Sequence, residues 1–161
     1  MDYGAIVRKY PPRREYLLMI LRDIQEAEPQ NYVSREAMRS VADYLNVTGA
    51  AVYGMVGYYS MLSAHPRGRH IIRLCRSPVC RMLGAFDLQA ALEEQLGVRM
   101  GATTADGSFT LESSECLGNC HHAPSMMIDE VLYSGVTAEK LGRILDRVRK
   151  GRLRDGEASD G

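Results

Sequence analysis

Apolar residues recur at helical spacing three times in the first sixty residues. The first stripe follows Pro11-Pro12, the second follows Ser34, which can cap a helix, and the third spans residues 52–59. The stripes consist of Leu17, Ile20, Leu21 and Ile24; of Met38, Val41, Ala42 and Leu45; and of Val52, Met55, Val56 and Tyr59. Because short amphipathic helices cannot bury an apolar face alone, this half predicts a bundle of packed helices.

Beyond His65 the pattern changes, because proline and glycine interrupt it and residues 71–74 have the length and branching of a buried strand. A helix is predicted over 85–96, with a glycine stop at 97, and a strand at 109–111. Residues 126–128 and 131–133 flank Asp129-Glu130 as a tight hairpin, and Thr137 caps a last helix with apolar residues from 141 to 148. The order strand, helix, strand, hairpin, helix indicates an open sheet with helices packed on it, as in a thioredoxin-like α/β domain.

These patterns predict an α/β protein with three segments. Residues 1–68 form an N-terminal helical bundle, and residues 69–150 form a thioredoxin-like domain with a small mixed sheet flanked by helices. Residues 151–161 have almost nothing to bury and are expected to be a disordered tail.

Charge and composition give no indication of binding to nucleic acid or to a membrane. Twenty basic and twenty acidic residues balance in a chain of 161, so no overall field favours nucleic acid or an anionic membrane. The charge-free stretch 46–66 is long enough to cross a bilayer, but it is rich in tyrosine and glycine, so we expect a helix buried against protein and no membrane insertion. The first residues lack the pattern of a secretory signal, which favours a cytoplasmic location.

All four cysteines lie in the second half and form two pairs, Cys75 with Cys80 and Cys116 with Cys120. Four residues separate the first pair and three separate the second. Each pair follows a predicted strand, and loops at the ends of adjacent strands can converge. Four thiolates around one point suit Zn²⁺ or an iron–sulfur cluster.

Two other uses of the cysteines are disfavoured. Disulfides need an oxidising compartment, and a thiol oxidoreductase of thioredoxin type needs two intervening residues. Structural zinc usually takes its ligands from tighter knuckles, whereas a [2Fe–2S] cluster is wider and suits longer loops, which Pro78 can stiffen and Gly118 can turn. The spacing favours iron and leaves open a zinc-stabilised four-cysteine module without a redox role.

Several segments together carry a resemblance to a known family. They are residues 106–110 (Asp-Gly-Ser-Phe-Thr), 116–124 (Cys-Leu-Gly-Asn-Cys-His-His-Ala-Pro), 52–55 (Val-Tyr-Gly-Met), 58–60 (Tyr-Tyr-Ser), 66–68 (Pro-Arg-Gly) and 72–75 (Ile-Arg-Leu-Cys). The chain resembles, over residues 10 to 150, the thioredoxin-like [2Fe–2S] subunit family of respiratory NADH dehydrogenase. That family also serves NAD-linked hydrogenases, formate dehydrogenases and electron-bifurcating complexes.

The resemblance implies an electron-transfer subunit of an NADH-linked oxidoreductase. Cys75, Cys80, Cys116 and Cys120 would ligate one [2Fe–2S] cluster, while FMN and NAD(H) would bind a partner flavoprotein subunit, with further iron–sulfur or catalytic subunits in the complex. The chain itself has no glycine-rich dinucleotide fingerprint.

Two features depart from the family pattern. The first loop, residues 76–79, is bulkier and more basic than expected, and His121 and His122 follow the last cysteine. Because four cysteines already supply a full ligand set, the histidines are expected to be exposed and receive no ligand role.

Overall fold

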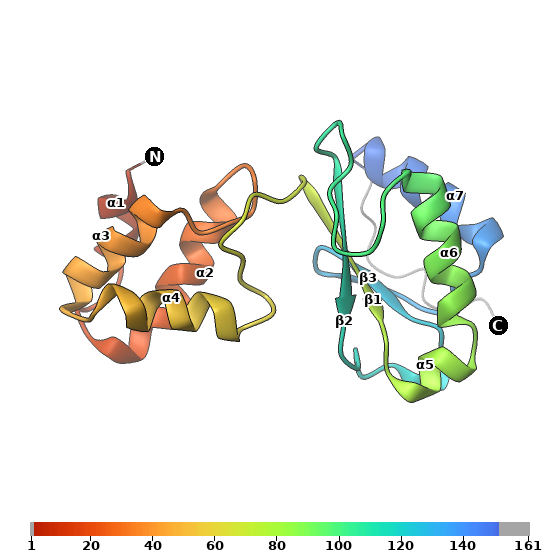
Figure 1. Cartoon of the computed structure of the whole chain (residues 1–161), viewed down its shortest axis with the longest axis horizontal. Coiled ribbons are helices and arrows are strands. Elements are labelled where there is room, and N and C mark those ends of the chain that lie inside the picture. The colour runs from red at the N-terminus through yellow and green to blue at the C-terminus, as the bar shows by residue number, and fades with distance from the viewer. Residues whose placement is uncertain (1, 152–161) are drawn as a thin grey trace. The chain divides into compact units, whose positions relative to one another are not determined.

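The structure is a computed structural model that describes residues 2–151 (Figure 1). The chain divides into two compact units between Arg67 and Gly68. The tail expected to be disordered lies, from residue 152 on, outside the described residues.

The first unit is a bundle of short helices, as the apolar stripes predict. Its elements are α1 (Tyr3–Val7), the 3₁₀ helix η1 (Arg14–Tyr16), α2 (Leu17–Ala27), α3 (Arg35–Leu45) and α4 (Gly49–Tyr58). The side chain of Ser34 accepts a hydrogen bond from the N–H of Ala37 and so caps α3, which confirms the predicted cap. Thr48 caps α4 in the same way through the N–H of Ala51.

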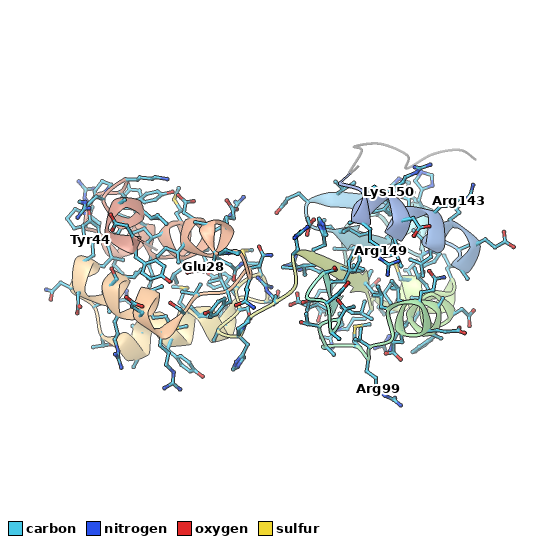
Figure 2. The ribbon with its side chains drawn as sticks, turned by 90° about the horizontal axis from the view of Figure 1, so that it is seen from above. Glu28, Tyr44, Arg99, Arg143, Arg149 and Lys150 are labelled. Carbon is cyan, nitrogen blue, oxygen red and sulfur yellow. The ribbon has the colours of Figure 1, made fainter. Side chains whose placement is uncertain are left out.

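The core of the helical unit contains the three predicted stripes, of which only Met55 and Tyr59 are not fully buried. Tyr44, labelled in Figure 2, donates a 2.5 Å hydrogen bond to the carbonyl of Tyr10 and ties α3 to the segment after α1. The side chains of Tyr53 and Tyr58 are 60% and 82% exposed. Among residues 2–151, none of the helices has both the length and the apolar character needed to cross a membrane.

The second unit contains the predicted four-stranded mixed sheet. Its elements are β1 (His70–Cys75), α5 (Pro78–Met82), α6 (Ala85–Leu96), β2 (Phe109–Ser114), the 3₁₀ helix η2 (Cys120–His122), β3 (Met126–Ile128), β4 (Val131–Tyr133) and α7 (Ala138–Arg149). The strand order is β2-β1-β3-β4. Strands β1 and β2 are parallel, and the other two pairings are antiparallel.

Helices α6 and α7 pack against each other and cover one face of the sheet (Figure 1). Leu92 and Leu145 from these helices meet Ile72 and Leu111 from the two central strands, and all four are buried. The other face of β1 and β2 is mixed, because it carries the buried Ile71 beside Arg73, which forms a 3.4 Å ion pair with Glu112 directly opposite it on β2. The sheet is therefore apolar on its helix side and amphipathic overall.

Two short helices, α1 and α5, are not apparent from the apolar pattern. α5 overlaps the segment expected to be a loop between the first two cysteines, and Pro78 occupies its first turn, where a missing N–H is tolerated. Each helix has five residues, which is too short for an amphipathic period to appear.

A tight turn before β2 is held by the carboxylate of Asp106. That carboxylate accepts hydrogen bonds from the N–H and hydroxyl of Ser108, at 2.9 and 2.7 Å, and from the hydroxyl of Thr104. These bonds, with the Thr104 hydroxyl first, lower the pKa of Asp106 to about 2. The turn fixes the point at which β2 begins.

The two parallel strands begin with an unusually close backbone approach at Gly68. Its N–H donates to the Thr110 hydroxyl at 2.6 Å, and a Cβ at this position would lie 2.7 Å from the carbonyl carbon of Phe109. Because the obstacle is backbone, it cannot move aside cheaply. Glycine is therefore required here for β1 to pair with β2.

We expect Gly68→Ala to destabilise the second unit by about 1–3 kcal/mol, because the added methyl group forces the two strands apart. Gly54→Ala is the matched control, since a Cβ on Gly54 in α4 meets nothing within 4 Å and alanine favours a helix by ~0.5–1 kcal/mol. Urea unfolding measures the loss of stability, and amide hydrogen exchange shows whether β1 and β2 are the strands that lose protection. Equal protection of both strands in Gly68→Ala and the native chain would contradict the close approach.

Candidate metal centre

The four cysteines meet at one end of the sheet. Cys75 is the last residue of β1 and lies opposite Ser114, the last residue of the parallel strand β2. Strand β3 runs antiparallel to β1, so it begins at the same end, where Met126 faces Leu74. The loop from β2 to β3 must therefore start and finish beside Cys75.

The first pair, Cys75 and Cys80, is buried. Each residue is 1% exposed, and both pack with Ala85 in a small apolar cluster that Leu117 and Ala123 also contact. Cys80 belongs to α5, so this one-turn helix returns the second sulfur to the end of the strand. The segment predicted as a loop therefore contains a helix, which still brings the Cys80 sulfur close to Cys75.

The second pair, Cys116 and Cys120, lies on the loop after β2 and is more open. Their sulfurs are 3.4 Å apart, Cys116 is exposed, and Cys120 is half-buried. Gly118 between them adopts a φ of 77° and donates its N–H to the Cys116 sulfur at 3.4 Å. The expected glycine turn is confirmed, and it places both sulfurs on the same side of the loop.

The sulfur separation in the second pair is too long for a disulfide and is nearer to the separation of two ligands on one metal atom. A disulfide needs about 2.05 Å, whereas two thiolates on a tetrahedral centre with bonds of about 2.3 Å lie about 3.8 Å apart. The observed 3.4 Å is close to the second value. Within residues 2–151, no three side chains from His, Cys, Asp and Glu are arranged around a single ion.

Hydrogen bonds from the backbone reach the buried sulfurs. Burial raises the pKa of the Cys75 thiol, but its hydrogen bond with the Ser77 hydroxyl and those with the N–H groups of Ser77 and Leu117 outweigh burial and lower that pKa overall. Burial, together with the neighbouring Cys75, raises the pKa of Cys80, although the N–H of Ser125 donates to its sulfur. These donors point to a negatively charged group at the sulfurs.

The sulfurs also oppose one another's ionisation. The hydrogen bond with Cys116 is the main cause that raises the pKa of Cys120, followed by desolvation and by the charges of Cys116, Cys80 and Cys75. Cys120 therefore lies within electrostatic reach of the other three cysteines. A positively charged metal centre would allow them to be thiolates together, so the residues fit a metal–thiolate group.

Ser125 connects the two cysteine loops. It is 1% exposed, and its carbonyl accepts the N–H of Cys75 at 3.2 Å while its own N–H donates to the Cys80 sulfur. Its hydroxyl lies 3.4 Å from the carbonyls of Asn119 and His122 on the second loop. One buried serine thus contacts both halves of the site, and no motif in the sequence identified it.

Asn119 extends this connection to the hairpin. Its side-chain amide donates to the hydroxyl of Ser134, just after β4, at 2.5 Å and to that of Ser125 at 3.3 Å. The neighbouring His121 and His122 are exposed, as expected, with ring centroids 4.4 Å apart. The loop between the second cysteine pair and β3 is therefore held by hydrogen bonds to Ser125 and to Ser134.

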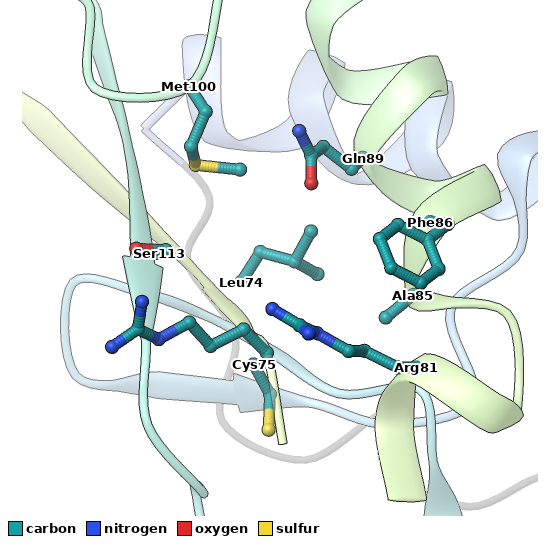
Figure 3. Close-up of a pocket in the computed structure, with 9 residues that line it drawn as sticks. Leu74, Cys75, Arg81, Ala85, Phe86, Gln89, Met100 and Ser113 are labelled. Atoms are coloured by element: carbon teal, nitrogen blue, oxygen red, sulfur yellow. The ribbon is translucent and has the colours of Figure 1, made fainter. Parts of the chain in front are cut away.

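A cavity of about 30 Å³ adjoins Cys75 (Figure 3). Leu74, Arg81 and Phe86 line it, with the Arg81 guanidinium 5.5 Å from the centroid of the Phe86 ring. Organic ligands usually need about 300–1,000 Å³, so this space can hold water but no substrate. Nearby, Arg76 is paired with Glu115.

The chain is similar to known proteins over most of its length. The family described as thioredoxin-like [2Fe-2S] ferredoxin matches residues 3–149. The E subunit of NADH-quinone oxidoreductase from Salmonella typhimurium is 42% identical over 120 residues, which cover 74% of this chain and 72% of that protein. The corresponding protein of Mycobacterium bovis is 32% identical over 149 residues, 92% of this chain and 58% of that protein.

A solved structure shares the fold. The air-oxidised NAD+-reducing [NiFe]-hydrogenase aligns with a TM-score of 0.74 at 16% identity, over 86% of this chain and 23% of the hydrogenase chain. At this identity the likeness concerns the fold alone.

We expect Ser125→Ala to destabilise the second unit by about 1–2 kcal/mol, because the buried carbonyls and amide that its hydroxyl contacts lose a partner. Ser113→Ala, at an exposed position of β2, is the matched control and should stay within about 0.5 kcal/mol of the native chain. Urea unfolding followed by circular dichroism compares the two. Equal unfolding midpoints for both variants would show that the serine does not connect the loops.

Proposed function

The chain belongs to the thioredoxin-like [2Fe-2S] ferredoxin family, and on that basis we propose that it carries one [2Fe–2S] cluster on Cys75, Cys80, Cys116 and Cys120. In this role it is an electron-transfer subunit of an NADH-linked oxidoreductase. The observation that carries the proposal is the convergence of two cysteine pairs at one sheet end, in a chain that the family matches almost throughout.

The arrangement in pairs supports a cluster with two metal atoms. Cys75 and Cys80 would serve one iron and Cys116 and Cys120 the other, since each pair comes from one connection. Bound there, a [2Fe–2S] cluster accepts and releases single electrons. The N–H donors at the sulfurs favour the added negative charge, and the buried first pair excludes water from one side.

The partner that supplies electrons is proposed to be a subunit that binds FMN and NADH. The similar proteins are subunits of NADH-quinone oxidoreductase, and the fold recurs in an NAD+-reducing hydrogenase. NADH gives up a hydride, which is a two-electron unit, whereas the cluster takes one electron at a time, so a flavin must stand between them. Further iron–sulfur or catalytic subunits complete the proposed complex.

Other proposed properties follow from charge and cysteine chemistry. The formal net charge of zero gives no general attraction for nucleic acid. Cysteines that hold a cluster must stay reduced, which fits a reducing compartment and supports the proposed cytoplasmic location.

Metal analysis tests the cluster. Anaerobically prepared chain should be reddish-brown and contain about two irons and about two acid-labile sulfides. Cys116→Ser should lose most of its iron, because a serine oxygen is a harder ligand than a thiolate. His121→Ala is the control and should keep the native content. Stoichiometric zinc without iron would replace this proposal with the zinc-stabilised binding module.

Mixing with NADH tests whether this chain depends on a flavoprotein partner to receive electrons. The isolated chain should not oxidise NADH, whereas addition of a cognate FMN subunit and NADH should bleach the cluster absorbance. Rapid NADH oxidation by the chain alone would show that it binds nucleotide itself. A stable complex whose cluster stays oxidised would refute the electron-carrier role.

A further inference from the structure

The hydroxyl of Ser77 contacts both sulfurs of the buried first cysteine pair. It lies 3.3 Å from the Cys75 sulfur. It also forms a hydrogen bond with the Cys80 sulfur, which opposes the rise in the pKa of that thiol. Among residues 2–151, this hydroxyl forms no other hydrogen bond. Its polar partners in the described chain are therefore the two sulfurs that would ligate one iron.

The position of Ser77 in the chain would ordinarily commit its hydroxyl to a helix. Ser77 directly precedes Pro78 at the start of α5, and its φ of −63° and ψ of 156° are those of a helix cap. Ser34 and Thr48, at the same position of α3 and α4, each accept a hydrogen bond from an N–H of the first turn. Ser77 makes no such bond. Helix capping therefore does not explain the hydroxyl, which is directed to the sulfurs instead.

Metal ligation would decide the direction of this hydrogen bond. A thiol can donate its own proton to a hydroxyl, but a thiolate ligand has none, so the Ser77 hydroxyl must then donate to the sulfur. Cys75 and Cys80 are each 1% exposed, so water does not compete for this donor and the bond acts in surroundings of low polarity. The N–H groups that reach the same sulfurs belong to the backbone, whereas the hydroxyl can be removed by substitution.

We propose that the Ser77 hydroxyl raises the reduction potential of the centre held by Cys75 and Cys80, because its hydrogen bond strengthens when an electron arrives. This inference rests on the proposed function. The added electron increases the negative charge on the sulfurs, and a donor stabilises the more negative state more than the less negative one. The hydroxyl keeps its proton throughout, so one electron enters and no proton moves.

A redox titration of the anaerobic, cluster-loaded full chain, followed by visible absorption, tests this role. In Ser77→Ala, the ratio of reduced to oxidised cluster at a fixed potential should fall about tenfold, which for one electron is a midpoint lower by about 59 mV. Ser77→Thr keeps a hydroxyl and should keep the native midpoint. Ser77→Val has nearly the shape of the threonine variant without its hydroxyl, and should match Ser77→Ala. This pair separates the hydrogen bond from the size of the side chain.

Ser113→Ala is the control, because Ser113 lines the cavity beside Cys75 but its hydroxyl forms no hydrogen bond with a sulfur among the described residues. It should keep the native midpoint. Electron–nuclear double resonance of the reduced cluster in D₂O gives a second measurement. The native chain and Ser77→Thr should show the coupling of an exchangeable deuteron that Ser77→Ala and Ser77→Val both lack.

The possible outcomes distinguish this inference from the proposed function. A native chain that binds no iron, or whose cluster cannot be reduced, would refute the proposed function. A native midpoint in both Ser77→Ala and Ser77→Val would overturn the role of Ser77 while the electron-carrier role stands. A midpoint in Ser77→Thr as low as in Ser77→Val would assign the shift to packing and also overturn it. Loss of iron from both variants that lack the hydroxyl would show that Ser77 holds the cluster rather than sets its potential, which contradicts the proposal.

Discussion

The parallel pairing of β1 with β2 is the constraint on which the site depends. Parallel strands end at the same edge of a sheet, so Cys75 and Ser114 finish opposite each other and both cysteine connections start from one place. The antiparallel return of β3 brings Ser125 to the same point. This pairing itself needs the backbone approach at Gly68, which no other residue permits without displacing Phe109. Gly68 precedes β1 and Cys75 ends it, so a glycine at one end of the strand determines where the sulfurs lie at the other end.

The surroundings of the sulfurs balance two opposing effects. Burial of Cys75 and Cys80 disfavours thiolates, whereas N–H groups of Ser77, Leu117 and Ser125 favour them. A neutral apolar pocket would not need these donors, and a solvated loop would not need the burial. The combination suits a charged inorganic group that must be kept from water and still accept another electron. The open second pair gives the same group access to solvent on one side.

Much of this architecture follows from the sequence, for identifiable reasons. Stripes such as Leu17 to Ile24 predict helices because they repeat over two turns, and the Asp129 turn predicts the hairpin, where Asp129 takes a φ of 53°. α5 is not predictable in this way, since one turn has no period. The role of Ser125 depends on contacts between segments fifty residues apart, which no local pattern encodes. The sequence predicts that the cysteine pairs converge, but the burial of one pair and the exposure of the other depend on how α5 and the later loop pack, which no local pattern encodes.

The proposed role requires the four cysteines to hold a single one-electron centre. A redox titration of the anaerobic native chain, followed by visible absorption and electron paramagnetic resonance, tests it most directly. If one [2Fe–2S] cluster is bound, the visible bands should bleach along a one-electron Nernst curve while about one unpaired spin per chain appears. A chain that stays colourless and develops no spin at any applied potential would contradict it.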